Sequence, residues 1–282
     1  MMCTGIGLVS QQGHPFWGRT QDFEQHFEYA GVKIPRGYEF TAAFTPFIAD
    51  QNVMGIAWAK DLHQSPVLLD GINDYGICGG SFYFDHFFKY AATETIHSTG
   101  KLAIRGEELC TWILTHYRSL DEIKQRLSED VGITNEVGPM MEMSVPLSFD
   151  EASSGLVGIP ADYKPESRFL RASFAKLLSI DVDDDTAMNQ VFQLLTTVNT
   201  PKGTLRIDQP ETPVAWTQYT AGYDIQKKIL YAFTYDNRNL RSLEYGDPAT
   251  WGSELHYFSF ISKQTTTPFV EKNQWMAGEN TI

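Results

Sequence analysis

The order of two apolar patterns along the chain constrains the fold most. Short runs of β-branched and aromatic residues bounded by turn residues lie toward both ends, and longer runs with helical spacing lie between them. Two strand blocks around a helical block differ from strict βαβ alternation and favour an α+β layered fold. The strand candidates are TGIGLVS (4–10), PFWGRTQDF (15–23), and residues 53–60, 67–73, 76–84, 216–224 and 229–236.

The helical block contains three segments, at 106–120, 167–180 and 186–198. In the first of them Leu109, Trp112, Ile113 and Tyr117 share one face at helical spacing. The acidic run DVDDD, at 181–185, directly precedes the third segment. It lacks the glycine turn and distal glutamate of a calcium loop, so it is interpreted as helix capping and dipole chemistry.

Length and charge limit the classes of protein to consider. The 282 residues, 42% of them hydrophobic, can bury a large core, and one domain over 1–282 is expected because no linker or repeat interrupts the chain. The 22 basic and 35 acidic residues give a net charge of −13. This charge argues against nucleic acid and anionic membranes as partners.

The lack of a recognisable targeting signal and the use of cysteine lead us to expect a cytoplasmic protein. No basic region followed by an apolar run opens the chain, and no apolar stretch approaches the roughly 18 residues of a membrane span. Cys3, Cys78 and Cys110 form no CxxC pair and leave one cysteine over, which fits a reducing compartment. Metal-ligand spacing is absent, so no metal site is expected.

The first predicted hairpin brings three reactive side chains together. Its returning strand carries Arg19 and Asp22 back toward Cys3. A thiol needs a base to become a nucleophile, and an α-amino group with a pKa of roughly 7.7–8.0 can serve if Cys3 becomes the first residue. Arg19 would then favour the thiolate, and Asp22 would orient the amine. The alternative is a small buried cysteine beside a solvated ion pair.

The remaining cysteines are interpreted as core residues. Cys110 and His116 lie six positions apart on one helix, too far around it for a catalytic pair. Cys78 sits between apolar residues and glycines of a strand candidate. The chain has no GxSxG, Walker A, GxGxxG or HExxH motif, so serine hydrolase, nucleotide-binding and zincin functions lack support.

A set of segments spread over most of the chain carries a family resemblance. The segments are MCTG, FWGRTQDFE, IPRGYEF, GINDYGICGGSFYF, LVGIPADYKPESRFLRASF, VNTPKGTL and YTAGYDIQKKILYAFTYDNRNLRS. Together and in this order they resemble the choloylglycine hydrolase family, the N-terminal-nucleophile amidases that include bile salt hydrolases and penicillin V acylases. The resemblance implies the family fold, a four-layer αββα sandwich, which agrees with the α+β order above.

The resemblance implies an active site and a reaction. Cys3 matches the nucleophile, Arg19 and Asp22 the charged residues beside it, and Arg168 the second active-site arginine. Tyr83 stands where penicillin V acylases have tyrosine and bile salt hydrolases have asparagine, and its N–H is expected to bind the oxyanion. The expectation is a penicillin V acylase-like hydrolase of linear amides, with a bile salt hydrolase as the alternative. Family members use no cofactor, and many are homotetramers.

The sequence departs from the family in two places. Met1 and Met2 precede Cys3, so activity requires translation from Met2 or loss of both methionines. Near 147–150 a segment of several tens of residues is expected to be missing, and with it the asparagine that donates to the oxyanion. A natural deletion, an incomplete sequence and a gene-model error all explain this. A further alternative is therefore a catalytically impaired homologue that only binds a ligand.

Overall fold

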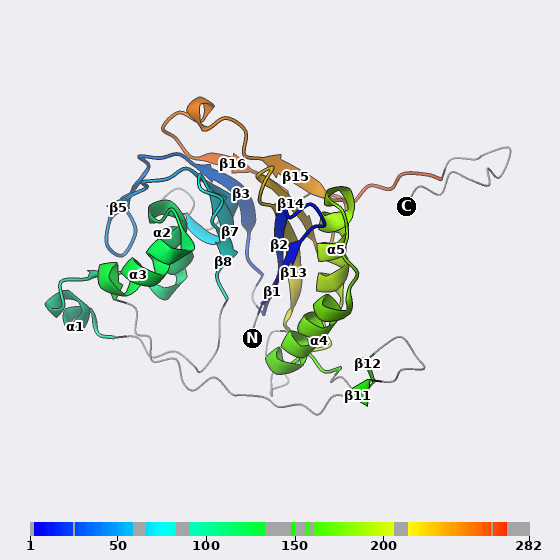
Figure 1. The fold of residues 1–282 in the computed structure, drawn as a ribbon. Coiled ribbons are helices and arrows are strands. Elements are labelled where there is room, and N and C mark those ends of the chain that lie inside the picture. Colours follow the sequence, from blue (N-terminus) through cyan, green and yellow to red (C-terminus); the bar gives the residue numbers. More distant parts are fainter. Residues whose placement is uncertain are drawn as a thin grey trace.

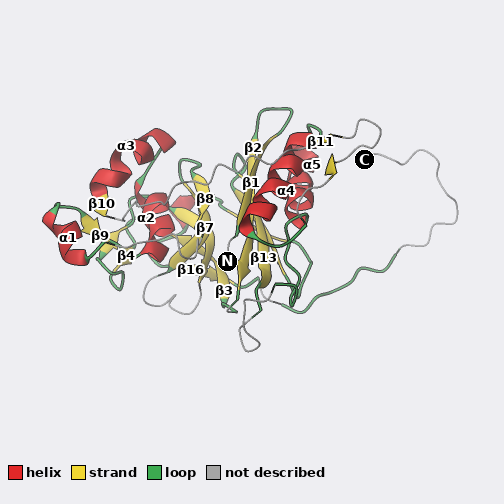
Figure 2. Ribbon diagram, turned by 90° about the horizontal axis from the view of Figure 1, so that it is seen from below, coloured by secondary structure: helices red, strands yellow, loops and turns green. Residues whose placement is uncertain are grey.

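The computed structural model describes residues 3–24, 26–58, 66–82, 91–132, 148–149, 156–157, 161–205, 214–260 and 262–269. Two antiparallel five-stranded sheets face each other, and helices cover their outer sides (Figure 1). The view from below shows the same succession of helix, sheet, sheet and helix (Figure 2). The expected α+β fold with four αββα layers is confirmed.

The first sheet combines the two ends of the described chain. Its order is β1-β2-β13-β14-β15, so the N-terminal hairpin pairs directly with C-terminal strands. The predicted hairpin is confirmed, with Thr4 opposite Thr20 and Val9 opposite Pro15. The strands are β1 (Thr4–Val9), β2 (Pro15–Phe23), β13 (Trp216–Asp224), β14 (Ile229–Thr234) and β15 (Arg241–Glu244).

The second sheet has the order β16-β3-β6-β7-β8. Its strands are β3 (Tyr29–Ile34), β6 (Val53–Trp58), β7 (Val67–Asn73), β8 (Cys78–Gly80) and β16 (His256–Phe258). Three short pairs join β4 (Glu39–Phe40) with β5 (Phe47–Ile48), β9 (Leu102–Ala103) with β10 (Val131–Gly132), and β11 (Ser148–Phe149) with β12 (Leu156–Val157).

The helices form the two outer layers. On the side of the second sheet lie α1 (Thr93–Ser98), α2 (Leu109–His116) and α3 (Leu120–Asp130), and on the side of the first sheet lie α4 (Pro165–Leu178) and α5 (Asp184–Thr196) (Figure 1). Short 3₁₀ turns occur at Gly106–Glu108 and Pro248–Thr250. Within the described residues, no helix combines the length and apolarity that a membrane crossing requires.

Alternation along the strands creates three apolar interlayers. Met54 and Ile56 of β6 pack with Tyr219 and Tyr223 between the sheets. Val53 and Ala57 of the same strand belong instead to the core under α2. A third core, beneath α4 and α5, contains Ile6, Leu8, Val191 and Leu195. Successive strand residues face opposite sides, so one strand supplies two of these cores.

Two paired glycines let α5 lie close against the first sheet. Gly18 of β2 stands opposite Gly222 of β13. A Cβ atom at Gly18 would lie 2.6 Å from the Val191 side chain, and one at Gly222 would lie 2.5 Å from the Met188 sulfur. Larger residues at these positions would push the helix away from the sheet.

The predicted helix over 106–120 is wrong at its C-terminal end. The α-helix α2 stops at His116, and Ser119 caps the next helix by accepting a hydrogen bond from the Glu122 backbone N–H. Between them Tyr117 has extended backbone, is fully buried and donates its hydroxyl to Asp130. Burial of this aromatic ring therefore competes successfully with continuation of the helix.

Candidate active site

Cys3 lies immediately before β1, at the end of the hairpin where β2 also ends. Its Sγ is 3.4 Å from Gln21 Oε1 and 4.0 Å from the Asp22 backbone oxygen. Residue Cys3 is partly exposed, whereas Gln21 is buried. The thiol is therefore held beside a buried amide oxygen and keeps access to solvent.

Arg19 reaches from β2 into the layer between the sheets and is fully buried. Its Nη1 donates to the Leu69 backbone oxygen at 2.6 Å, and its Nη2 donates to Gln21 Oε1. Gln21 Oε1 thus accepts hydrogen bonds from both the guanidinium and the Cys3 thiol. Gly80 makes room for this arrangement, because a Cβ atom there would lie only 3.0 Å from Arg19 Nη1.

The carboxylate facing Arg19 is Asp70 of β7, whose Oδ2 lies 3.8 Å from Arg19 Nη1. Asp70 also accepts hydrogen bonds from the hydroxyls of Tyr219, at 2.5 Å, and Tyr223. Burial raises the pKa of Asp70, while Arg19 and the two hydroxyls oppose that rise. Burial also raises the pKa of each tyrosine well above its usual value, so both remain hydrogen-bond donors.

The charge of Arg19 is strongly maintained. Burial disfavours the guanidinium cation, but the electrostatic influence of the acidic groups around it, Cys3, Tyr219 and Asp70, outweighs this effect and raises the pKa of Arg19. The side chain of Gln21 thus connects the charged Arg19 guanidinium to the Cys3 thiol.

Asp22 lies on the opposite face of β2, under the helices. Its Oδ2 is 2.5 Å from Nη1 of Arg168 on α4, and both residues are 2% exposed. Thr20 donates to Oδ2 at 2.7 Å, and Thr217 of β13 donates to Oδ1. The Thr4 N–H in turn donates to Thr20 Oγ1 at 3.2 Å. Asp22 is therefore linked through Thr20 to the backbone next to Cys3.

The structure brings Cys3, Arg19, Asp22 and Arg168 together near the start of β1, but Arg19 and Asp22 do not pair with each other. Arg19 and Asp22 are three positions apart on a strand and so face opposite sides of the sheet. Each has its own buried partner, Asp70 and Arg168 respectively. The alternative of a solvated ion pair at a strand end is wrong, because Arg19 and Asp22 are 0% and 2% exposed. Tyr83 lies outside the described residues.

Sequence reasoning missed Gln21 and Asp70. The hairpin register places Gln21 opposite Cys3, and strand alternation puts it on the face of Arg19, so the pattern contained this signal. Asp70 is the one charged residue in the apolar strand VLLDGIN. A charge in a buried strand requires a buried partner, but sequence alone does not say which cation supplies it.

Cys78 and Cys110 are poor nucleophiles. Cys110 is buried in the core under α2, which confirms its predicted place, and Cys78 packs beside the core between the sheets. Burial raises the pKa of Cys110 to about 12 and the pKa of Cys78 well above its usual value. Neither thiol ionises readily at neutral pH.

His116 stacks on Trp112, with ring centroids 3.7 Å apart, and its Nδ1 bonds the Trp112 carbonyl oxygen at 3.0 Å. Burial lowers its pKa below 6.5, although the hydrogen bond to Trp112 opposes this shift. Below pH 6.5 the unfolded chain therefore takes up a proton at this site that the folded protein resists, and stability falls. We expect His116→Gln to reduce the loss of unfolding free energy in urea between pH 7.5 and 5.5 (about neutral to mildly acidic). An unchanged loss would contradict this assignment.

The acidic run at 181–185 caps α5, as interpreted from the sequence. The Asp183 carboxylate accepts hydrogen bonds from the Thr186 N–H at 3.0 Å and from its hydroxyl at 2.6 Å. Asp184 bonds Ser10 and His14 at 2.5 Å each and thereby ties α5 to the first hairpin. In the part of the chain that the structure describes, no cluster of three His, Cys, Asp or Glu side chains could hold a metal ion.

Comparisons with known proteins identify the family of this chain. The family described as linear amide C–N hydrolases, choloylglycine hydrolase family, matches residues 3–153 and 146–248. The chain belongs to this family. Its two matches overlap at 146–153, in the region where the sequence predicts a missing segment.

Curated relatives and solved structures give the same picture. The bile salt hydrolase/transferase of Clostridium perfringens is 22% identical, over 92% of this chain and 97% of the relative. The Lactiplantibacillus plantarum bile salt hydrolase/transferase is also 22% identical, over 86% and 92%. A mutant conjugated bile acid hydrolase from C. perfringens has a TM-score of 0.77 at 21% identity, covering 95% of this chain and 99% of that one.

Penicillin V acylase from Agrobacterium tumefaciens shares the fold at a greater distance. It has a TM-score of 0.70 and 13% identity, covering 94% of this chain and 95% of that one. The N-terminal-nucleophile hydrolase fold is therefore common to both kinds of enzyme.

Proposed function

We propose that this protein hydrolyses linear amides with Cys3 as the nucleophile, and that conjugated bile acids are its substrates. The observation that carries the proposal is the Cys3 thiol at the head of β1, 3.4 Å from an oxygen that Arg19 holds in place. The family membership supports the amide bond as the target. The penicillin V acylase-like function, which was the main expectation from the sequence, rests on Tyr83. It becomes the second candidate, because the bile salt hydrolases are the more similar relatives and the penicillin V acylase shares the fold at lower identity.

The proposed reaction needs no proton donor or acceptor other than Cys3, the substrate and water. The Cys3 α-amine takes the thiol proton as sulfur attacks the amide carbonyl, and it gives that proton to the departing amine when the C–N bond breaks. A thioester remains, which water hydrolyses to the free acid with return of the proton to the thiol. Asp22, which is linked through Thr20 to the backbone beside Cys3, orients the Cys3 α-amine. Arg19 and Arg168 stabilise the negative charge that develops during the reaction. The Tyr83 N–H is proposed as an oxyanion donor.

The proposal extends to location and assembly. The three free cysteines support a reducing compartment, and we place the protein in the cytoplasm on that ground. A homo-oligomer, tetrameric by resemblance, is proposed for its assembly. Phe169, Leu177 and Ile180, on or just after α4, are 68%, 70% and 78% exposed, and such apolar side chains suit an interface between copies.

A substrate panel tests the proposal. Purified protein whose first residue is confirmed as Cys3 is incubated with a glycine-conjugated bile acid or with penicillin V, and both cleavage products are quantified by mass spectrometry. We expect kcat/KM for the bile acid conjugate to be at least about tenfold higher. Faster cleavage of penicillin V would favour the Tyr83-based alternative. Cleavage of neither amide would contradict hydrolysis and favour a ligand-binding homologue.

A further inference from the structure

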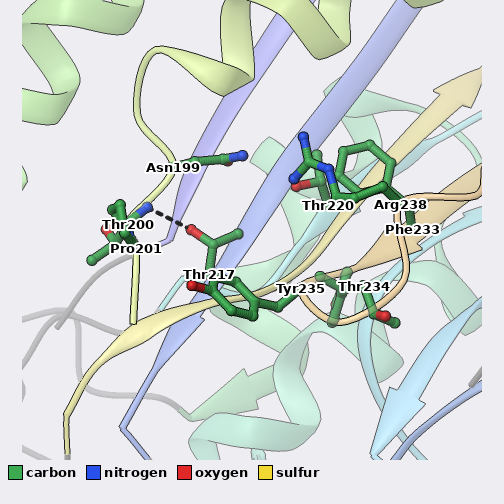
Figure 3. A pocket seen from close by; sticks show the side chains of 10 residues that line it. Asn199, Thr200, Pro201, Thr217, Thr220, Phe233, Thr234, Tyr235 and Arg238 are labelled. Carbon is green, nitrogen blue, oxygen red and sulfur yellow. Dashed lines mark hydrogen bonds between the residues drawn. The ribbon is translucent and has the colours of Figure 1, made fainter. Parts of the chain in front are cut away.

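A cavity of about 250 Å³ lies beside the active-site cluster, on the helix side of the first sheet. Its walls come from the segment after α5, from β13 and from the end of β14 with the following loop (Figure 3). The cavity would hold a molecule the size of an amino acid, since one liquid water occupies about 30 Å³. Its lining residues are Asn199, Thr200, Pro201, Thr217, Tyr219, Thr220, Phe233, Thr234, Tyr235 and Arg238.

Three buried polar atoms in this lining have no hydrogen-bond partner among the residues that the structure describes. They are Asn199 Oδ1, Thr200 Oγ1 and Thr220 Oγ1. Thr200 and Thr220 are both 1% exposed. Leaving a buried polar group unpaired costs about 1–3 kcal/mol, so three around one cavity indicate that something else satisfies them.

A cation stands at the edge of the same cavity. Arg238 is exposed, and its guanidinium carbon lies 4.5 Å from the centre of the Phe233 ring. Within the described chain no carboxylate forms an ion pair with it. Figure 3 shows Arg238 and Asn199 extending toward each other from opposite sides.

The chemistry of these groups defines a ligand. The guanidinium and the two threonine hydroxyls can donate to an anionic group, while Asn199 Oδ1 can only accept. A guanidinium matches a carboxylate in shape and charge. The Phe233 and Tyr235 rings offer apolar surface to a short carbon skeleton. We propose that this cavity is a binding site for a small amino acid, with its carboxylate on Arg238 and its ammonium group on Asn199 Oδ1.

The site is connected to Asp22 by two hydrogen bonds. The Thr200 N–H donates to Thr217 Oγ1 at 2.9 Å, and Thr217 Oγ1 donates to Asp22 Oδ1. A ligand that contacts Thr200 therefore lies next to Thr217, whose hydroxyl donates to the Asp22 carboxylate. Binding there does not depend on which amide, if any, the protein cleaves.

Calorimetric titration with three matched probes tests the site: L-alanine, propionate, which lacks the amine, and ethylamine, which lacks the carboxylate. We expect L-alanine to bind in the millimolar range (about 1–10 mM), propionate at least about fivefold more weakly, and ethylamine not measurably. Absence of L-alanine binding up to about 50 mM would overturn the proposal and leave only water in the cavity.

Two variants and a control assign any binding to this cavity. Arg238→Gln, at an exposed position, is expected to weaken L-alanine binding about tenfold or more, because it removes a charged hydrogen bond. Thr220→Val, of nearly the same shape, is expected to weaken it about threefold or more. Arg36→Gln removes an exposed charge outside the lining and is expected to leave binding unchanged. Equal affinity in Arg238→Gln and the unaltered protein would overturn the proposal.

Discussion

Replacing Cys3 with alanine is expected to lower amide hydrolysis by about 10⁴-fold or more without unfolding the protein. The thiol is the bond-forming group in the proposed reaction, so its loss removes the covalent step entirely. Among the described residues, the Cys3 Sγ has a 3.4 Å contact to Gln21 and a 4.0 Å contact to the Asp22 backbone oxygen. Gln21 keeps its hydrogen bond from Arg19 in the variant. The measurement is product formation by mass spectrometry, beside a thermal unfolding curve.

Cys78→Ala provides the matched control for this experiment. It also removes one thiol, but from β8, where burial keeps the pKa of Cys78 high. This variant is expected to retain hydrolysis. Hydrolysis in the folded Cys3→Ala protein at the rate of the unaltered protein would rule out Cys3 as nucleophile.

The second large effect is expected for Asp70→Asn, which should lower the free energy of unfolding by about 3–5 kcal/mol. Asp70 and Arg19 are both fully buried, so removing the carboxylate charge leaves a guanidinium without its counter-charge between the sheets. Asparagine also offers one acceptor oxygen where two tyrosine hydroxyls donate. Urea unfolding followed by tryptophan fluorescence measures the change.

Asp121→Asn is the control, because Asp121 pairs with Lys124 at 3.5 Å on the surface and both side chains are largely exposed. Its removal is expected to leave the unfolding midpoint nearly unchanged. Similar destabilisation by both substitutions would contradict the structural importance of the Asp70 and Arg19 pair.

The sequence predicts the layers of the fold well. Apolar residues at helical spacing mark α4 and α5, and two strand runs joined by a turn mark the hairpin of β1 and β2. These patterns are local, so they survive in any tertiary context. The neighbours of the hairpin could not be predicted in this way, because β2 pairs with β13 about two hundred positions later.

Within the active site, too, local features could be predicted from the sequence and long-range contacts could not. The positions of Cys3, Arg19 and Asp22 along one hairpin can be read from the sequence. Whether Arg19 faces Asp22 or Asp70 depends on the opposing sheet, and a strand pattern carries no information about which residue lies across an interlayer. Only the family resemblance predicted Arg168 as a site residue, because Arg168 and its partner Asp22 are 146 positions apart in the sequence.

The predicted loss of a segment near 147–150 would also affect catalysis. The family model matches residues 3–153 and 146–248 separately. The absence of a stretch near 147–150 within one domain stays a prediction from the sequence. Loss of one oxyanion donor costs about 10²–10³ in rate by precedent. Hydrolysis slower than in relatives is therefore compatible with a functional Cys3.

The most direct test of the central claim is the intact mass of the purified protein before and after brief exposure to limiting iodoacetamide, with the labelled peptide mapped. We expect a chain that begins at Cys3 and takes up one label there, because burial raises the pKa of both Cys78 and Cys110. The unlabelled mass also reveals whether residues beyond those of the 282-residue sequence are present. A chain that retains Met2, or that labels Cys78 or Cys110 as fast as Cys3, would contradict the assignment of Cys3 as an N-terminal nucleophile.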